Sequence, residues 1–164
     1  MKIRYIIALA SLIALPSLHC SIASTAIENS PLSIKDLIND GFNFEYRIQG
    51  LAWDLSGLGI DSLDGIVDLA WKYPRYNEKK EQVFPTLMIL NNNNLTNLDW
   101  TINFPELLII YAANNNLSND MDLDFATALA NLNTLDVSGN NLSNRTLTNI
   151  RSKNRELNVI NKDQ

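Results

Sequence analysis

The aspartates of Asp120-x-Asp122-x-Asp124 are the residues in this chain that come nearest to a metal-binding motif. This spacing matches the start of a calcium loop, in which oxygen ligands alternate along the chain. Such a loop has glycine at its sixth position and glutamate at its twelfth, but Phe125 and Asn131 stand there. We therefore interpret the aspartates as the solvated start of a helix, where carboxylates are favoured, and predict no metal site.

Covalent and acid–base catalysis have almost no candidates. The chain holds one histidine, His19, and one cysteine, Cys20, and both lie in a segment interpreted below as a removed leader. The remaining chain then lacks thiol nucleophiles, histidine bases, disulfides and zinc sites built from cysteine or histidine. We predict no catalytic residue and no cofactor, and therefore a protein that is not an enzyme.

The N-terminus has the features of an export signal. Lys2 and Arg4 give a positive start, residues 5–18 are mostly apolar, and small residues precede Ser24. Cleavage before Ser24, or before Ile27, would leave an exported chain that is periplasmic or secreted. No later stretch is apolar enough to cross a membrane.

Two alternatives to a cleaved signal stay open. The leader could remain as an uncleaved anchor, or Cys20 could carry a lipid. Either case gives an envelope-tethered structural protein that resembles a lipoprotein. The mass of the exported form separates these alternatives from the soluble one.

The charge of the chain excludes one class of partner. The net charge is −5 at pH 7, and loss of Lys2 and Arg4 would leave 11 basic against 18 acidic residues, a net of −7. An acidic surface repels phosphate backbones. We predict no nucleic-acid partner.

Leucine and asparagine dominate the chain after the leader and recur together at fixed offsets. From Ser24 onward there are 21 leucines and 23 asparagines in 141 residues, and ordinary domains are not rich in asparagine. The copies are Trp53-x-Leu55-x-x-Leu58-x-Ile60, Met88-x-Leu90-x-x-Asn93-x-Leu95, Leu107-x-x-Ile110-x-Ala112-x-x-Asn115-x-Leu117, Leu132-x-x-Leu135-x-Val137-x-x-Asn140-x-Leu142, and a half-copy, Leu157-x-Val159.

This pattern resembles the leucine-rich repeat family, whose unit is L-x-x-L-x-L-x-x-N-x-L over about 20–29 residues. The resemblance covers residues 50–162. It implies an α/β leucine-rich-repeat solenoid, with a short parallel β-sheet on the concave side, helices and turns on the convex side, and an N-terminal cap helix. The predicted domains are a signal peptide (1–23), a lead-in with the cap helix (24–49), and a leucine-rich repeat domain (50–164) of about four repeats plus a terminal half-repeat.

The asparagine that follows each strand has a physical role in this frame. A sharp turn leaves backbone groups unpaired, and a buried amide side chain can donate and accept at once. We therefore predict a structural asparagine ladder that satisfies neighbouring turns and is made of Asn93, Asn115 and Asn140. Leu58 replaces asparagine in the first copy, where one side of the ladder has no preceding partner.

Capping signals place the helices between the strands. Ser33 to Asp40, followed by Gly41, predicts the N-terminal cap helix. Ser62 and Ser143 are each expected to cap a later helix. Residues 74–82 are expected to form a charged surface loop.

Two further groups of residues have an ordinary structural interpretation. Trp53 occupies a core position and Trp71 is expected on a buried helix face, so both are interpreted as packing and not as a carbohydrate platform; Trp100 is left unplaced. The N-x-S/T sequences at Asn94, Asn116 and Asn141 fall on the repeat frame, which accounts for them without glycosylation.

The concave face is the predicted binding surface. Strand side chains alternate in direction, so one set from each strand points outward. That set is Asp54, Ser56, Ile89, Asn91, Tyr111, Ala113, Asp136 and Ser138. Ile89 and Tyr111 give it an apolar centre between acidic flanks, which fits either a protein-binding patch or a solvated sheet. Asp54 and Asp136 stand three strands apart, on the order of 14 Å, which is too far for paired-carboxylate hydrolysis.

We expect from these features a non-catalytic protein–protein interaction module that is exported and binds a protein through its concave face. Family analogy extends this expectation to an envelope or host interface.

Overall fold

The computed structural model describes residues 32–119 and 124–162. The predicted signal peptide, both cleavage sites and Cys20 lie outside the described residues. The helical elements are α2 (Ile34–Asn39), α3 (Ile66–Lys72), the 3-10 turn η1 (Asp99–Asn103), α4 (Asp124–Ala128) and α5 (Asn144–Lys153). The strands are β1 (Ile48–Gln49), β2 (Ala52–Asp54), β3 (Arg75–Tyr76), β4 (Gln82–Val83), β5 (Leu87–Ile89), β6 (Ile109–Tyr111), β7 (Thr134–Asp136) and β8 (Asn158–Ile160).

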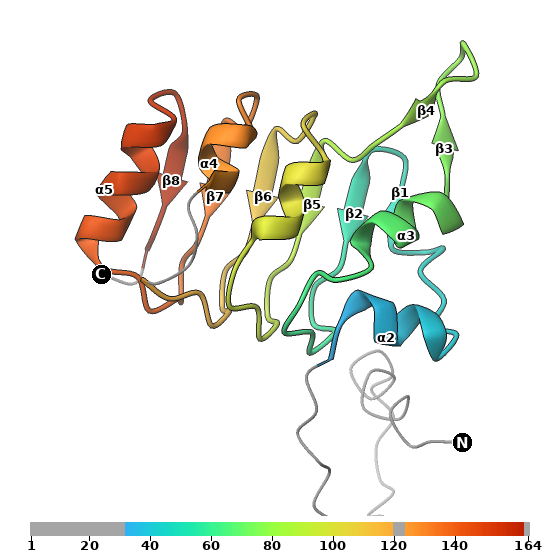
Figure 1. Cartoon of the computed structure of the whole chain (residues 1–164), viewed down its shortest axis with the longest axis horizontal. Helices are drawn as coiled ribbons and strands as arrows, with labels where there is room; N and C mark the ends of the chain where they lie inside the picture. The colour runs from blue at the N-terminus through green and yellow to red at the C-terminus, as the bar shows by residue number, and fades with distance from the viewer. Residues whose placement is uncertain (1–31, 120–123, 163–164) are drawn as a thin grey trace, which may run out of the picture. The chain divides into compact units, whose positions relative to one another are not determined.

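Six short strands form one mixed sheet in the order β1-β2-β5-β6-β7-β8 (Figure 1). Within this sheet, β2, β5, β6, β7 and β8 are parallel and in register. Trp53 pairs with Met88, Met88 with Ile110, and Ile110 with Leu135. β1 runs antiparallel to β2 through a tight turn at Gly50, whose φ is +60°. A separate antiparallel hairpin joins β3 to β4.

The predicted leucine-rich-repeat solenoid with a parallel sheet is wrong. The structure is a mixed α/β fold: its six-stranded sheet begins with the antiparallel pair β1–β2, and few helices accompany it. The physical reason lies in the connections. Gly50 lets the chain reverse before β2, and the hairpin β3–β4 stands in the long connection before β5, where a charged loop was expected.

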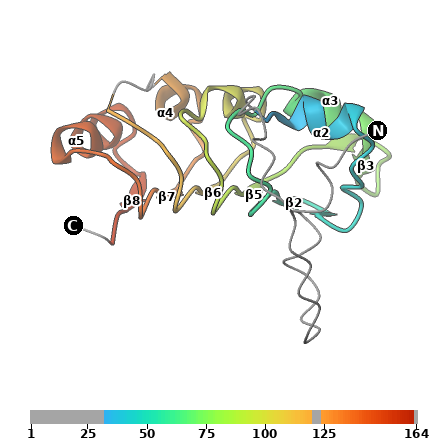
Figure 2. The same ribbon diagram turned by 90° about the horizontal axis from the view of Figure 1, so that it is seen from below.

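The helices lie on one face of the sheet, and no described helix covers the other face (Figure 2). Two of them begin at the predicted caps. Ser33 caps α2 in a reciprocal pair with Asp36, and Ser143 caps α5 by accepting from the Thr146 backbone N–H. α3 begins later than predicted. The Ser62 hydroxyl accepts from the Asp64 backbone N–H within a turn before the helix, and Gly65 is the residue that directly precedes α3. None of the described helices is long and apolar enough to cross a membrane.

The core lies between the sheet and the helices. The middle residue of β2, β5, β6, β7 and β8 is buried, as are the next apolar residues Leu55, Leu90, Ala112 and Val137. Phe104, Leu129 and Ile150 from the helix side pack into the same cluster. Full burial of one such leucine or isoleucine contributes about 1.5–3 kcal/mol, so this layer supplies most of the driving force for folding.

The tryptophans divide between core and surface. Trp53 is buried and packs edge-on against Phe104, with ring centroids 5.5 Å apart. Trp71 is 65% exposed, so the prediction that it lies on a buried helix face is wrong. The short α3 buries Ile66, Leu69 and Ala70 instead.

Candidate binding surface

The outward face of the sheet carries two parallel rows of side chains, one from each end of the strands. Backbone pairing aligns the members of each row across β2, β5, β6, β7 and β8. The first row is Ala52, Leu87, Ile109, Thr134 and Asn158. The second row is Asp54, Ile89, Tyr111, Asp136 and Ile160. We call these ten residues the sheet face.

Strand alternation separates the sheet face from the core. The residue between the two rows is buried in every strand, whereas no member of either row is buried. Four of the predicted residues, Asp54, Ile89, Tyr111 and Asp136, share the second row. The structure therefore brings together two apolar side chains with one carboxylate at each side.

The other predicted residues lie beyond the strands and serve the turns. The Asn91 side-chain oxygen accepts from the Ala113 backbone N–H at 2.8 Å. Ser138 is buried, and its hydroxyl accepts from the Lys162 backbone N–H at 3.1 Å. The Ser56 hydroxyl donates to Asp54. These side chains are committed to neighbouring groups, so the sheet face itself is the better candidate surface.

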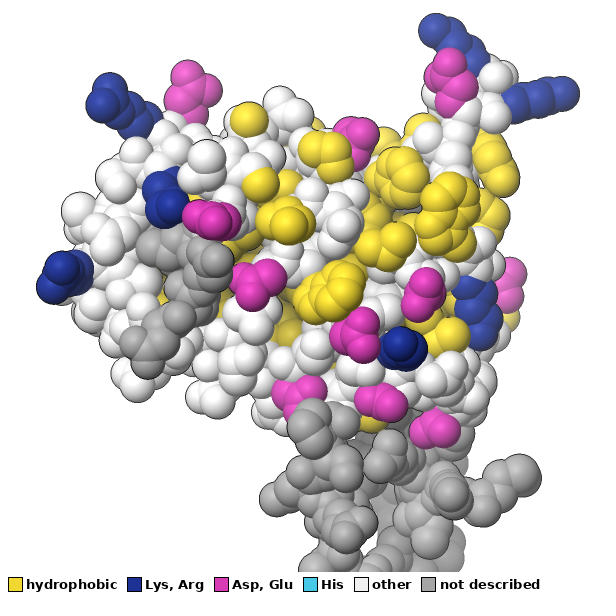
Figure 3. All heavy atoms as spheres, viewed as in Figure 1, with side chains coloured by type: hydrophobic (Ala, Val, Ile, Leu, Met, Phe, Trp, Pro, Cys, Tyr) yellow, Lys and Arg dark blue, Asp and Glu magenta, His cyan; other side chains and the backbone are white. Residues whose placement is uncertain are grey.

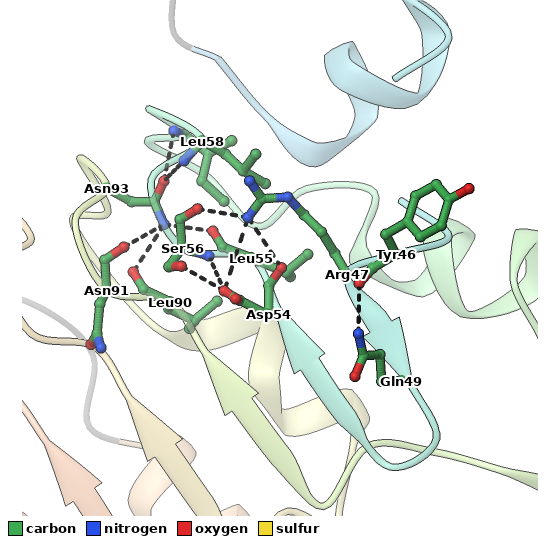
Figure 4. A network of polar contacts seen from close by, with 11 residues as sticks. Tyr46, Arg47, Gln49, Asp54, Leu55, Ser56, Leu58, Leu90, Asn91 and Asn93 are labelled. Carbon is green, nitrogen blue, oxygen red and sulfur yellow. Dashed lines mark hydrogen bonds and ion pairs between the residues drawn. The ribbon is translucent and has the colours of Figure 1, made fainter. Parts of the chain in front are cut away.

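Asp54 is held by its own turn and by an arginine from the chain before β1 (Figure 4). Its Oδ1 accepts from the Ser56 backbone N–H at 3.0 Å and from the Ser56 hydroxyl at 2.5 Å. The Arg47 guanidinium lies 4.0 Å from the same oxygen and donates to the Ser56 carbonyl at 2.9 Å. The Asp54 side chain is still 51% exposed, so Arg47 offsets its charge only in part.

Asp136 has a similar turn but no arginine partner among the described residues. Its Oδ1 accepts from the Ser138 backbone N–H at 2.9 Å, which fixes the carboxylate at the end of β7. Salt bridges within the described residues join Arg47 to Asp54 and Lys153 to Asp124 and do not involve Asp136. Asp136 is therefore the less compensated of the two carboxylates on the sheet face.

The asparagines at 93, 115 and 140 lie at successive turns directly after the sheet. Asn93 Nδ2 donates to the carbonyls of Leu55 and Leu90, both at 2.9 Å, while its Oδ1 accepts from the Leu58 N–H (Figure 4). Asn115 spans to the carbonyl of Leu90, and Asn140 to that of Ala112, each at 2.9 Å. Each amide thus ties its own turn to the preceding one, which holds the strands of the sheet face in register.

A second set of turn residues escaped the sequence analysis. The third residue past the end of β2, β5, β6 and β7 has a left-handed backbone. These residues are Gly57, Asn92, Asn114 and Gly139, with φ between +55° and +67°. Only glycine and asparagine adopt this conformation readily. The sequence contained a signal for these turns, because glycine or asparagine recurs at spacings of 35, 22 and 25 residues, which are also the spacings of the repeat.

Six of the ten sheet-face residues were also missed. Leu87 and Ile109 lie outward in the first row, and Ile160 ends the second row. Ile160 was missed because the half-copy aligned Val159 with Val137, whereas Val159 pairs with Leu135. That prediction of register was wrong by two residues, since the turn before β8 is longer than the pattern assumed.

The N-x-S/T sequences at Asn94, Asn116 and Asn141 recur in step with the ladder, as the repeat frame predicts. The ladder asparagines 93, 115 and 140 each come one residue before Asn94, Asn116 and Asn141, which are exposed. The residue after each of these, Leu95, Leu117 or Leu142, is buried. The frame thus explains the position of the sequences through the leucine and not through the asparagine.

The helix side has its own exposed hydrophobic side chains. Trp71 on α3, Tyr76 on β3, and Trp100 and Ile102 on η1 are each at least 40% exposed. Figure 3 shows hydrophobic groups gathered on this side, with acidic and basic groups scattered among them. We call these four residues the helix-side surface. They come from short, separate elements and do not share a strand register.

Among the described residues, the carboxylates considered for metal binding and for hydrolysis do not cluster. Asp120 and Asp122 lie outside the described residues, and Asp124 pairs with Lys153 at 3.2 Å. No group of three or more metal-binding side chains occurs among the described residues. Asp54 and Asp136 lie on strands separated by two others, about 14 Å apart at the usual strand spacing. They cannot act as a catalytic pair.

The chain matches no family model, and no curated protein is significantly similar to it. The resemblance to leucine-rich repeats rests on the sequence pattern alone. The function is therefore inferred from the geometry and charge of the surface.

Proposed function

We propose that this chain is a non-catalytic module that binds a polypeptide through the sheet face. The observation that carries the proposal is the second row, in which Ile89 and Tyr111 lie side by side between Asp54 and Asp136. An apolar centre with a polar rim is the usual anatomy of a protein-binding surface. Leu87 and Ile109 extend the apolar centre into the first row.

The hydrogen bonds at the ends of the strands support the same proposal. Ordering side chains at an interface costs about 0.5–1.5 kcal/mol for each flexible group, so a surface fixed in advance binds better. The ladder asparagines 93, 115 and 140 hold the turns, and the Asp54 and Asp136 carboxylates are each bound by the backbone two residues later. The helix-side surface is more exposed but has no such fixed array, so it is the weaker candidate.

The proposal includes export from the cytoplasm, to the periplasm or beyond. It is supported by the basic and apolar composition of residues 1–23. The negative charge of the chain favours a partner that carries basic groups and disfavours nucleic acid.

A random peptide library displayed against the purified full chain tests the proposal. Enriched peptides are then assayed on two matched variants, Ile89→Lys on the sheet face and Ile102→Lys on the helix-side surface. Both changes replace an isoleucine by lysine, at the half-buried Ile89 on β5 and at Ile102, which is 47% exposed on η1. The proposal predicts that binding is lost with Ile89→Lys and kept with Ile102→Lys. Binding that survives Ile89→Lys, or that only Ile102→Lys removes, contradicts it.

A further inference from the structure

We infer that the ligand of the sheet face is an extended polypeptide that crosses the strands and carries the sequence basic–x–apolar–x–basic. This inference rests on the proposed function and narrows it to one class of partner. It follows from the charge, spacing and register of the second row.

The charge of the sheet face favours basic groups on the ligand. Among its ten side chains, Asp54 and Asp136 are the charged ones, and both are negative. Neither is buried, so both can reach a cation in a bound segment. Lysine or arginine on the ligand would complement this pair, and the charge of Asp136 is the less offset of the two.

The spacing sets how far apart the two basic residues stand. Asp54 on β2 and Asp136 on β7 are separated by three strand steps, about 14 Å at the usual strand spacing. An extended chain advances about 3.4 Å per residue, so four residues span the same distance. Positions i and i+4 of an extended chain point to the same side, because its side chains alternate. The two basic residues can therefore meet both carboxylates at once.

The residue midway between them meets the apolar centre. Position i+2 shares the same side and lies about 7 Å from each end, over the boundary between β5 and β6. Ile89 and Tyr111 occupy that place in the row. A leucine, valine or isoleucine there would bury apolar surface, whereas a polar residue would be desolvated without a partner.

A helical ligand fits the same two carboxylates poorly. A helix rises 1.5 Å per residue, so about nine residues cover 14 Å, but nine residues at 3.6 per turn end on the opposite side of the helix. Same-side positions at i+7 or i+11 lie about 10 or 16 Å apart. The extended segment is therefore the occupant that the row favours.

Three labelled nine-residue peptides of equal composition test this inference by fluorescence anisotropy with the full chain. They contain Lys-Ser-Leu-Ser-Lys, Lys-Leu-Ser-Ser-Lys and Lys-Ser-Leu-Lys-Ser. The first keeps all three groups in place, the second moves the leucine to the other side, and the third shortens the basic spacing. We expect the first to bind about two- to fivefold tighter than each of the others.

Two charge variants complete the experiment. Asp136→Asn should weaken the first peptide by about two- to fivefold and by more than Asp54→Asn does, whereas Asp68→Asn, an exposed carboxylate on α3, should change nothing. Equal affinity for all three peptides, with binding still lost in Ile89→Lys, would overturn the motif and leave the proposed function standing. Peptide binding that is unchanged in Ile89→Lys, or no binding of any of the three peptides, would overturn the inference. Library peptides whose binding is also unchanged in Ile89→Lys would overturn the proposed function itself.

Discussion

The Asn115 side chain joins two turns through Leu90: its Nδ2 donates to the Leu90 carbonyl at 2.9 Å, across 25 residues of chain. The same Nδ2 lies 3.1 Å from the Ala112 carbonyl, and Oδ1 accepts from the Leu95 N–H at 3.0 Å. One side chain therefore satisfies backbone groups on two neighbouring segments. This contact fixes the turns that follow β5 and β6, and with them the spacing of the sheet face.

Replacing this asparagine should cost stability. We expect Asn115→Ala to lower the free energy of unfolding by roughly 1–3 kcal/mol, because the partly buried backbone groups lose their partners. Asn116→Ala is the matched control, since its side chain is exposed, and it should stay within about 0.5 kcal/mol of wild type. Urea unfolding followed by circular dichroism measures both. Equal midpoints for the two variants would show that the ladder does not stabilise the turns.

Gly65 should not tolerate a side chain. Its φ is +86°, and a Cβ there would stand 2.6 Å from the backbone nitrogen of Lys35, which cannot move freely within α2. Gly59 is the control, because its φ is +69° but nothing lies within 4 Å of its Cβ position. We expect Gly59→Ala to cost about 1 kcal/mol for the left-handed backbone. Gly65→Ala should lower the free energy of unfolding by at least about 1 kcal/mol more than Gly59→Ala does, in the same assay. Equal losses of stability in the two variants would refute the close packing of α2 on α3.

At each open edge of the six-stranded sheet, an arginine side chain donates a hydrogen bond to a backbone carbonyl of the edge strand. Arg75 Nη2 donates to the Ile48 carbonyl on β1 at 2.9 Å, and Arg151 Nη2 donates to the Val159 carbonyl on β8 at 3.0 Å. Unpaired edge groups invite pairing with another chain, and charged side chains at an edge oppose it.

Removing one edge arginine should therefore promote association. We expect Arg151→Leu to raise the apparent mass with concentration in sedimentation velocity, since the Val159 carbonyl becomes free and the edge loses its charge. Arg145→Leu, an exposed arginine on the same helix, controls for the loss of charge alone. Identical sedimentation of the two variants would indicate that Arg151 does not protect the edge.

Tyr111 should matter for binding and not for folding. Its side chain is only partly buried, so Tyr111→Ala should keep a cooperative thermal transition close to that of wild type. Affinity for peptides that depend on Ile89 should fall by at least about tenfold, because the aromatic ring supplies much of the apolar centre. Unaltered affinity would remove Tyr111 from the binding surface.

Local features of the fold could be predicted where one residue decides them. Ser33 and Ser143 begin helices because a hydroxyl satisfies the first free N–H groups, which requires only nearby residues. Asp54, Ile89, Tyr111 and Asp136 could be assigned to one row because strand alternation and the repeat spacing agree.

Long-range pairing and the whole class of the fold could not be read in the same way. The reversal at Gly50 that makes β1 antiparallel depends on a left-handed backbone, which a single glycine allows but does not demand. The register of Val159 depends on the length of the turn after α5, which no residue pattern marks. The repeat pattern thus predicted the positions of the middle strands. It also predicted a solenoid, which the mixed sheet contradicts.

The exposure of Trp71 was missed for a related reason. α3 is only seven residues long, and its buried side is filled by Ile66, Leu69 and Ala70. Helical spacing alone cannot tell which side of so short a helix meets the core.

A nitrogen-15 NMR titration of the full chain with the Lys-Ser-Leu-Ser-Lys peptide tests whether binding occurs on the sheet face. We expect the largest amide shift changes at Ile89, Tyr111 and Asp136 and their row neighbours on β5, β6 and β7. Changes that instead centre on Trp71 in α3 and Trp100 in η1 would contradict this expectation, because they would place binding on the helix side of the sheet.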